Sequence, residues 1–89
     1  MFYVYVLQSK DRFYIGSTDN LKRRIKEHNA GQNIATKPYL PWSLICYEAH
    51  FNQEDSLRRE KYLKKNQGKH ALRRMLKCYL GNEGRYFDY

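Results

Sequence analysis

The sequence predicts a small α+β domain in which helices flank a three-stranded antiparallel sheet, with the elements in the order ββαβαα. One observation behind this prediction is a pair of aromatic and β-branched runs, residues 2–8 and 13–17, separated by a short polar turn. Another is the helical spacing of apolar residues in later segments. The length of 89 residues is typical of one domain, and 42% of the residues are hydrophobic. We assign residues 1–80 to this domain and residues 81–89 to a C-terminal tail.

The two N-terminal runs predict a hairpin whose register follows from the positions of its tyrosines. Pairing across a turn at residues 9–12 places Tyr5 opposite Gly16 and Leu7 opposite Tyr14. Both tyrosines then lie on one face of the sheet, and the glycine leaves room above it. A slip of one residue would undo this arrangement, so the register is a specific prediction.

The later elements are placed by capping residues, glycines and apolar spacing. A helix over about residues 20–29 begins after a cap at Thr18 or Asp19 and stops at Gly31. Two prolines shape the loop over residues 32–42, and the apolar run over residues 43–51 forms the third strand. A second helix covers residues 54–66 and breaks near Gly68, and a third covers residues 70–80.

The excess of positive charge indicates a polyanionic partner. The chain has 17 Lys and Arg against 9 Asp and Glu, a net charge of +8, which attracts nucleic acid first and anionic membranes second. Cys46 and Cys78 form neither a disulfide framework nor a CxxC pair, and the three histidines lack the spacing of a zinc site. The N-terminal apolar run is too short for a signal peptide or a membrane span, so we expect a cytoplasmic protein without a membrane partner.

Two of the predicted helices carry charged groups beside their apolar stripes, where such groups are costly. In the first helix, Arg24 borders a stripe that ends at His28. In the second helix, Glu60 lies three residues from both Leu57 and Leu63, which mark its buried face. Arg24 can be a snorkelling side chain, or the two charges can form a buried salt bridge, which stabilises a fold only weakly. Neither structural interpretation excludes a functional role for these charged residues.

The same groups fit the hydrolysis of a phosphodiester, which needs a nucleophilic water, a base, a cation for the charged phosphorane and often a divalent metal. Glu60 can supply one oxygen ligand to Mg²⁺, and Arg24 can hold non-bridging oxygens with its planar fork. A tyrosine is a poor base at neutral pH unless a neighbouring cation favours its phenolate. Tyr5 and Tyr14 would lie close to such cations.

These residues resemble the motifs of the GIY-YIG nucleases, most closely the small stand-alone bacterial members of the YhbQ-like group. The tripeptide "YVY" at residues 3–5 stands in the place of the first motif, and "YIG" at residues 14–16 is the second motif without change. The segment "NLKRRIKEHN" matches the family's helix, and "SLRREKYLKK" matches the segment with its metal-binding glutamate. The resemblance covers about residues 1–65.

The resemblance implies metal-dependent hydrolysis of a DNA phosphodiester by a water molecule in line with the leaving oxygen. It implies that Tyr5 is the base, that Tyr14 assists or orients the water, and that Arg24 stabilises the phosphorane. It further implies that Glu60 holds Mg²⁺ or Mn²⁺ and that His28 orders the site or contacts phosphate.

The chain departs from the family pattern in two respects. Tyr3 stands where the first motif of the family has a glycine. Characterised members also attach this module to a second domain that selects the DNA, and 89 residues leave no room for one. A protein partner would then supply substrate selectivity.

Basic residues dominate the last two predicted helices and can bind phosphates without sequence preference. In the loop over residues 32–42, Thr36, Lys37, Tyr39 and Trp42 can contact a branched or single-stranded substrate, although Trp42 is favoured as a core anchor. The residues expected to bind nucleic acid are Lys22, Arg23, Lys37, Arg58, Arg59, Lys61, Lys64 and Lys65.

The leading hypothesis is a structure-selective DNA endonuclease in repair or recombination, acting on branched, flapped or single-stranded DNA. One alternative is a nucleic-acid-binding module of the same fold with little or no cleavage. Another is an adaptor domain that recruits an acidic partner through its basic surface. An acid on the inward side of a basic helix favours the enzyme, because a chain without catalysis has no evident reason to keep it.

Overall fold

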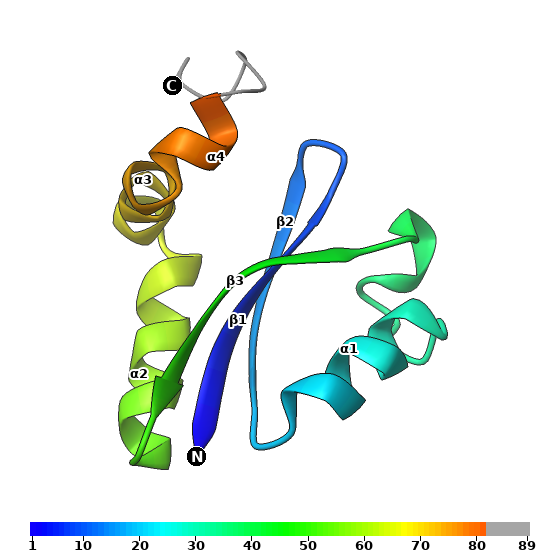
Figure 1. Ribbon diagram of the computed structural model, residues 1–89, viewed down its shortest axis with the longest axis horizontal. Coiled ribbons are helices and arrows are strands. Elements are labelled where there is room, and N and C mark those ends of the chain that lie inside the picture. The colour runs from blue at the N-terminus through cyan, green and yellow to red at the C-terminus, as the bar shows by residue number, and fades with distance from the viewer. Residues whose placement is uncertain (82–89) are drawn as a thin grey trace.

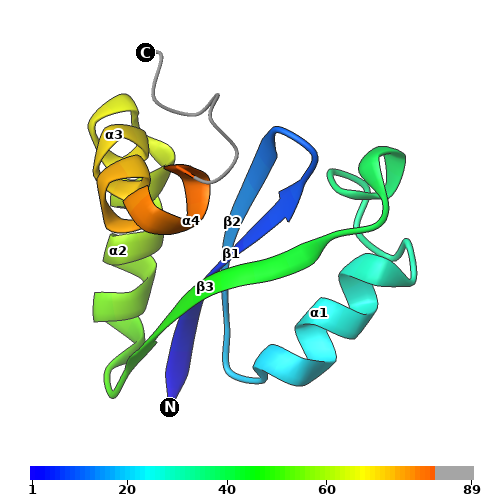
Figure 2. The same cartoon turned by 45° about the horizontal axis from the view of Figure 1, so that its top comes forward.

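The computed structural model of the protein describes residues 1–81 and contains one antiparallel sheet with helices on both faces. The central strand β1 (Phe2–Ser9) pairs with β2 (Arg12–Thr18) on one side and with β3 (Ser43–His50) on the other. Helix α1 (Leu21–Asn29) and helix α2 (Gln53–Lys64) lie on opposite sides of the sheet (Figure 1, Figure 2). The predicted fold class is confirmed.

The C-terminal part of the described chain differs from the prediction in where its helices end. Helix α2 stops at an extended Lys65, and two helices follow, α3 (Asn66–Met75) and α4 (Lys77–Gly81). Gly68 lies inside α3 and does not break a helix. A Cβ atom at Gly68 would lie 1.9 Å from the carbonyl oxygen of Tyr62, so the glycine allows α3 to pack closely against the end of α2. Of the predicted tail over residues 81–89, Gly81 is the last residue of α4, and residues 82–89 lie outside the described residues.

The hairpin has the predicted register. Tyr5 pairs with Gly16, Leu7 with Tyr14, and the strands alternate their side chains between the two faces of the sheet. Toward α2 and α3, β-branched side chains of β1 and β2 form a core with two helical leucines. Its buried members are Val4, Val6, Ile15, Leu63 and Leu72. Toward α1, the buried residues Tyr5, Leu7 and Trp42 form a second core. Trp42 is therefore a core residue, as the packing interpretation expects.

One helix is rotated relative to its prediction, and another has a different cap. Leu57 is 47% exposed, while the adjacent Ser56 is buried, so the prediction that Leu57 marks the buried face of α2 is wrong. At the start of α1, the side chain of Asn20, not of Thr18 or Asp19, accepts the hydrogen bond from the backbone N–H of Arg23 at 3.0 Å.

Gly16 is required by the close approach of the Tyr5 ring. A Cβ atom built at Gly16 would lie 2.5 Å from the Tyr5 hydroxyl oxygen and 2.6 Å from its Cζ. We expect Gly16→Ala to lower the free energy of unfolding by about 2 kcal/mol, because the buried ring must move. Chemical denaturation measures this loss. In a Tyr5→Leu background the same substitution should cost much less, and an equal cost in both backgrounds would contradict the steric explanation.

Candidate active site

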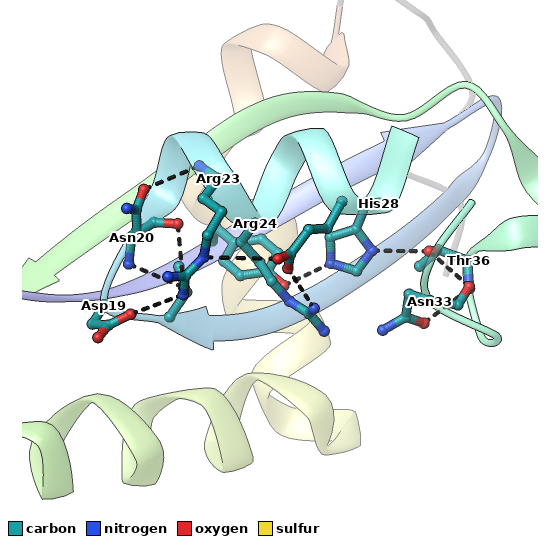
Figure 3. A network of polar contacts seen from close by, with 10 residues as sticks. Asp19, Asn20, Arg23, Arg24, His28, Asn33 and Thr36 are labelled. Atoms are coloured by element: carbon teal, nitrogen blue, oxygen red, sulfur yellow. Dashed lines mark hydrogen bonds and ion pairs between the residues drawn. The ribbon is translucent and has the colours of Figure 1, made fainter. Parts of the chain in front are cut away.

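A chain of hydrogen bonds connects the first strand to α1 and the following loop. The Nε2 atom of His28 lies 2.8 Å from the hydroxyl of Tyr5, and its Nδ1 lies 2.9 Å from Oγ1 of Thr36 (Figure 3). The indole N–H of Trp42 donates to the backbone oxygen of Thr36 at 2.8 Å. The loop therefore holds the imidazole ring in place. Thr36 is buried behind His28, so the expectation that it contacts substrate is wrong.

His28 is held as a neutral imidazole. Burial lowers the pKa of His28 below its usual 6.5, the positive charge of Arg24 lowers it further, and Glu27 acts in the opposite direction. A neutral ring has one N–H, so one ring nitrogen donates a hydrogen bond and the other accepts. Tyr5 and Thr36 both have hydroxyls, which can do either. His28 can therefore accept a proton from Tyr5 while donating to Thr36.

Tyr5 is a neutral phenol whose ionisation depends on its cationic neighbour. It is only 1% exposed, and this burial raises the pKa of its hydroxyl to about 12. The guanidinium of Arg24 opposes the shift, whereas the negative charge of Glu60 adds to it. Tyr14, which is half-buried, packs its ring 4.9 Å from the ring of His28. Both tyrosines therefore belong to one cluster with the histidine.

Arg24 leaves the same face of α1 as His28 and points toward the sheet (Figure 3). Its Nη1 donates to Oε1 of Glu27 at 3.0 Å, and this hydrogen bond is the main cause of the raised pKa of the guanidinium. The side chain of Arg24 is 31% exposed. The pairs formed are Arg24 with Glu27 and Glu60 with Lys64, so the alternative of an Arg24–Glu60 salt bridge is wrong.

The carboxylate of Glu60 is half-buried beside the edge strand β2. Its Oε1 accepts a hydrogen bond from the Ser17 hydroxyl at 2.7 Å, and its Oε2 accepts one from the Lys64 ammonium at 2.8 Å. The side chain is 18% exposed, so it is neither turned into bulk solvent nor sealed among aliphatic groups. Glu60 lies on the α2 side of the sheet and the tyrosines lie on the α1 side. β2 is an edge strand of the sheet, and across it Glu60 is close enough to act electrostatically on the Tyr5 hydroxyl.

The donor set at this edge fits a hard divalent cation better than zinc. Within residues 1–81, no group of three or more His, Cys, Asp or Glu side chains could hold a metal ion. Mg²⁺ is usually bound through one or two carboxylates, several waters and the phosphates of the substrate. Glu60 would supply one such carboxylate if its Oε2 exchanged the Lys64 ammonium for the cation.

The basic residues expected to bind nucleic acid are divided between two sides of the molecule. Arg59 donates two hydrogen bonds of 3.0 Å to Glu48 on β3, which lowers the pKa of that carboxyl, and Arg58 pairs with Asp55. Arg59 therefore lies on the β3 side, and Arg58 lines a cavity there together with His50 at the end of β3. Lys64 is the member of the set that contacts Glu60. The side chains of Lys22, Arg23, Lys37, Lys61 and Lys65 are exposed, and Arg23 pairs with Asp19.

Sequence reasoning missed two groups at the site. The first is Ser17, which orients Glu60 and follows the second motif directly. Strand alternation places Ser17 on the face opposite to Gly16, toward α2, and this was a usable signal. The second group consists of Lys69 and Arg73 on α3, which line a cavity together with Lys64 and Tyr14. Their position depends on the angle between α2 and α3, for which the sequence gives no direct signal.

The hairpin, the tyrosine–histidine cluster and the glutamate beside β2 are the features of one known class of protein. A family model described as the GIY-YIG catalytic domain matches residues 1–75, which extends to the end of α3. The chain belongs to the GIY-YIG nuclease family.

Within that family, the chain is similar to small bacterial proteins named UPF0213. It is 38% identical over 87 residues to a UPF0213 protein of Pediococcus acidilactici, covering 93% of this chain and 84% of that protein. It is 42% identical over 67 residues to one of Clostridium perfringens, covering 73% and 72% of the two chains. A solution NMR structure of a UPF0213 protein from Bacillus halodurans is 32% identical and superposes with a TM-score of 0.53, covering 84% of this chain and 85% of that one.

None of the helices within residues 1–81 is long and apolar enough to cross a membrane.

Proposed function

We propose that this protein is a metal-dependent endonuclease that hydrolyses a DNA phosphodiester. The observation that carries the proposal is the hydrogen bond between Tyr5 and a buried, neutral His28, beside the guanidinium of Arg24. A buried base next to a phosphate-binding cation is an arrangement that a purely structural core does not need. The half-buried carboxylate of Glu60 across the edge of β2 adds a cation ligand.

Hydrolysis begins when Tyr14 orients a water molecule at the phosphorus. Tyr5 accepts a proton from this water and passes its own phenolic proton to Nε2 of His28, which is already within hydrogen-bond distance. The new P–O bond forms as the bond to the leaving sugar oxygen breaks, and a solvent proton neutralises that oxygen. Arg24 exchanges its contact with Glu27 for the non-bridging oxygens and stabilises their added charge.

Glu60 would hold Mg²⁺ or Mn²⁺ with its carboxylate, and Ser17 keeps that carboxylate oriented. When bound, the cation supplies Lewis-acid stabilisation of charge on the phosphate and leaving oxygens. Lys64, once released from Glu60, is free to contact a neighbouring phosphate.

The proposed substrate is DNA with a branch, flap or single-stranded segment, of the kind processed in repair or recombination. The net charge of +8 supports binding to a polyanion without selecting a sequence. The proposal includes selectivity for DNA structure, supplied by the domain itself or by a protein partner. The alternative function is a nucleic-acid-binding module with little cleavage, which the charge alone would also support.

The test is a cleavage assay on duplex, single-stranded, flapped, forked and four-way DNA with Mg²⁺, Mn²⁺ or a chelator. We expect cleavage of at least one branched or single-stranded DNA with either cation, and none with the chelator. Tight, salt-sensitive binding without cleavage of any substrate would reject the nuclease and support the binding module. Cleavage that persists in the chelator would reject the metal dependence.

The pH dependence of cleavage tests the role of His28. Because its pKa is lowered from 6.5, the ring is neutral and able to accept a proton at pH 7 and above. We expect the rate to be constant above pH 7 and to fall only on an acidic limb that lies below the usual imidazole pKa of 6.5, where the ring becomes protonated. His28→Gln should remove this acidic limb and slow the reaction. A rate that keeps rising with pH toward the ionisation of Tyr5 would contradict the transfer to His28.

A further inference from the structure

A cavity of about 250 Å³ lies along the open edge of β2, at the junction of α2 and α3. We call it the edge pocket. Its apolar side is formed by Ile15 and Leu72, which are buried, and by the half-buried ring of Phe13. Cationic side chains line the rest of the cavity, namely Lys64, Lys69 and Arg73. An apolar, aromatic wall next to three cations differs from an ordinary solvated basic surface, which has no apolar cavity.

The edge pocket adjoins the candidate active site, with which it shares two residues. Tyr14 lines the pocket and also packs against His28. Lys64 lines the pocket and also pairs with Glu60 at 2.8 Å. A group in the pocket would therefore lie beside Lys64, which contacts Glu60 on the side of the candidate active site. The pocket is in the right place for the neighbouring part of the same substrate strand.

Size and chemistry restrict what the pocket can hold. An engineered apolar cavity of about 150 Å³ is enough for one benzene molecule, so 250 Å³ accommodates one aromatic heterocycle. Aromatic side chains bind nucleobases by stacking, and lysine and arginine bind the phosphates on either side. The open edge of β2 also presents backbone donors and acceptors that can reach the polar edge of a base.

We propose that the edge pocket binds one unpaired nucleobase adjacent to the scissile phosphate. This inference rests on the proposed function and specifies its substrate as DNA with an unpaired nucleotide next to the cut. A base within a regular duplex is stacked and paired and cannot enter the pocket without leaving the helix, which costs least when the base is already unpaired. An apolar side chain of a protein partner would fit the wall but would bring no anion to the three cationic side chains.

The experiment measures DNA binding in chelator, where no cleavage occurs. Two matched duplexes carry the fluorescent base 2-aminopurine, either paired with thymine or as a single-nucleotide bulge. We expect the protein to bind the bulged duplex roughly tenfold more tightly, on the scale of one base–aromatic stack, and to quench the 2-aminopurine only there. Equal affinity for the two duplexes, or no quenching of the bulged base, would overturn the proposal.

Variants of the pocket separate stacking from charge. Phe13→Leu keeps an apolar side chain and removes the ring, so it should abolish the preference for the bulge without changing affinity for the paired duplex. Phe51→Leu is the matched control, at a residue that is 91% exposed and follows β3. It should change neither the preference for the bulged duplex nor the affinity for the paired duplex. Lys69→Gln should weaken binding to both duplexes equally. If Phe13→Leu weakened binding to both duplexes equally, the substitution would have caused a general loss of structure or charge, and the stacking role of Phe13 would be overturned.

The binding result is independent of catalysis. A preserved bulge preference in a protein that cuts no DNA would uphold the pocket and reject the proposed nuclease. Cleavage of duplex DNA without any bulge preference would uphold the nuclease and reject the pocket.

Discussion

Replacing Glu60 with glutamine should reduce DNA cleavage by at least about 10³-fold, to the level of the chelated protein, while DNA binding is retained. The substitution keeps the shape of the side chain and its hydrogen bond with Ser17, but it removes the negative charge that would hold the cation. Loss of metal assistance costs several kcal/mol of transition-state stabilisation, and about 4 kcal/mol corresponds to a factor of 10³ in rate. Single-turnover cleavage with saturating protein measures this loss.

DNA affinity should be unchanged or higher in the same variant. The ammonium of Lys64 forms an ion pair of 2.8 Å with the carboxylate of Glu60. A glutamine at position 60 removes the negative charge, so Lys64 can bind a DNA phosphate instead. Binding measured by fluorescence anisotropy in chelator should therefore be equal to or tighter than that of the unmodified protein. A nuclease site that has lost only its metal ligand has this combination of properties.

Glu54→Gln is the matched control, because it removes the same charge from the same helix at an exposed position in the first turn. The Glu54→Gln variant should cleave DNA at a rate within about twofold of the unmodified protein, because Glu54 does not contact the candidate active site and the substitution alters only a surface charge. If Glu60→Gln cuts as fast as Glu54→Gln does, the carboxylate of Glu60 has no role in catalysis. If Glu60→Gln instead loses DNA binding, its role is structural.

The hairpin could be predicted in detail because its signals are local. Alternation along two short runs gave the faces of the strands, and the only glycine in β2 marks the place where the Tyr5 ring crosses it. A pairing error of one residue would have put the two tyrosines on opposite faces of the sheet. The residues of the hairpin thus determine its strand register, and the positions of Tyr5 and Tyr14 could be predicted from that register.

The positions of the site residues on the helices were harder to predict, because they depend on the rotation of each helix about its axis and on the packing between helices. Leucine spacing in α2 suggested that Leu57 is inward, but Ser56 occupies the buried position and Leu57 is exposed. An error of one residue turns a helix by about 100°. Arg59 consequently faces Glu48 on β3, while Glu60 faces Ser17 on β2. Neither partner is near in sequence, so no local pattern indicated these pairs.

Arg24→Ala should slow cleavage by about 10² to 10³-fold, the effect of losing one donor that stabilises charge in a transition state. The loss of stability should be small, since the pair that Arg24 forms with Glu27 is partly exposed and such pairs contribute little. Arg24→Lys retains the charge but not the planar fork, so it should restore only part of the rate. Thermal unfolding and single-turnover cleavage separate the two effects.

A second measurement distinguishes direct action on the phosphate from a purely structural role for Arg24. The positive charge of Arg24 lowers the pKa of His28, so its removal should raise that pKa and move the acidic limb of the rate profile to higher pH. Lys26→Ala removes the same charge from the exposed side of α1 and should change neither the rate nor the limb. If Arg24→Ala lowered the rate no more than Lys26→Ala does, Arg24 would be only a surface cation, and the proposed stabilisation of the phosphorane would be wrong.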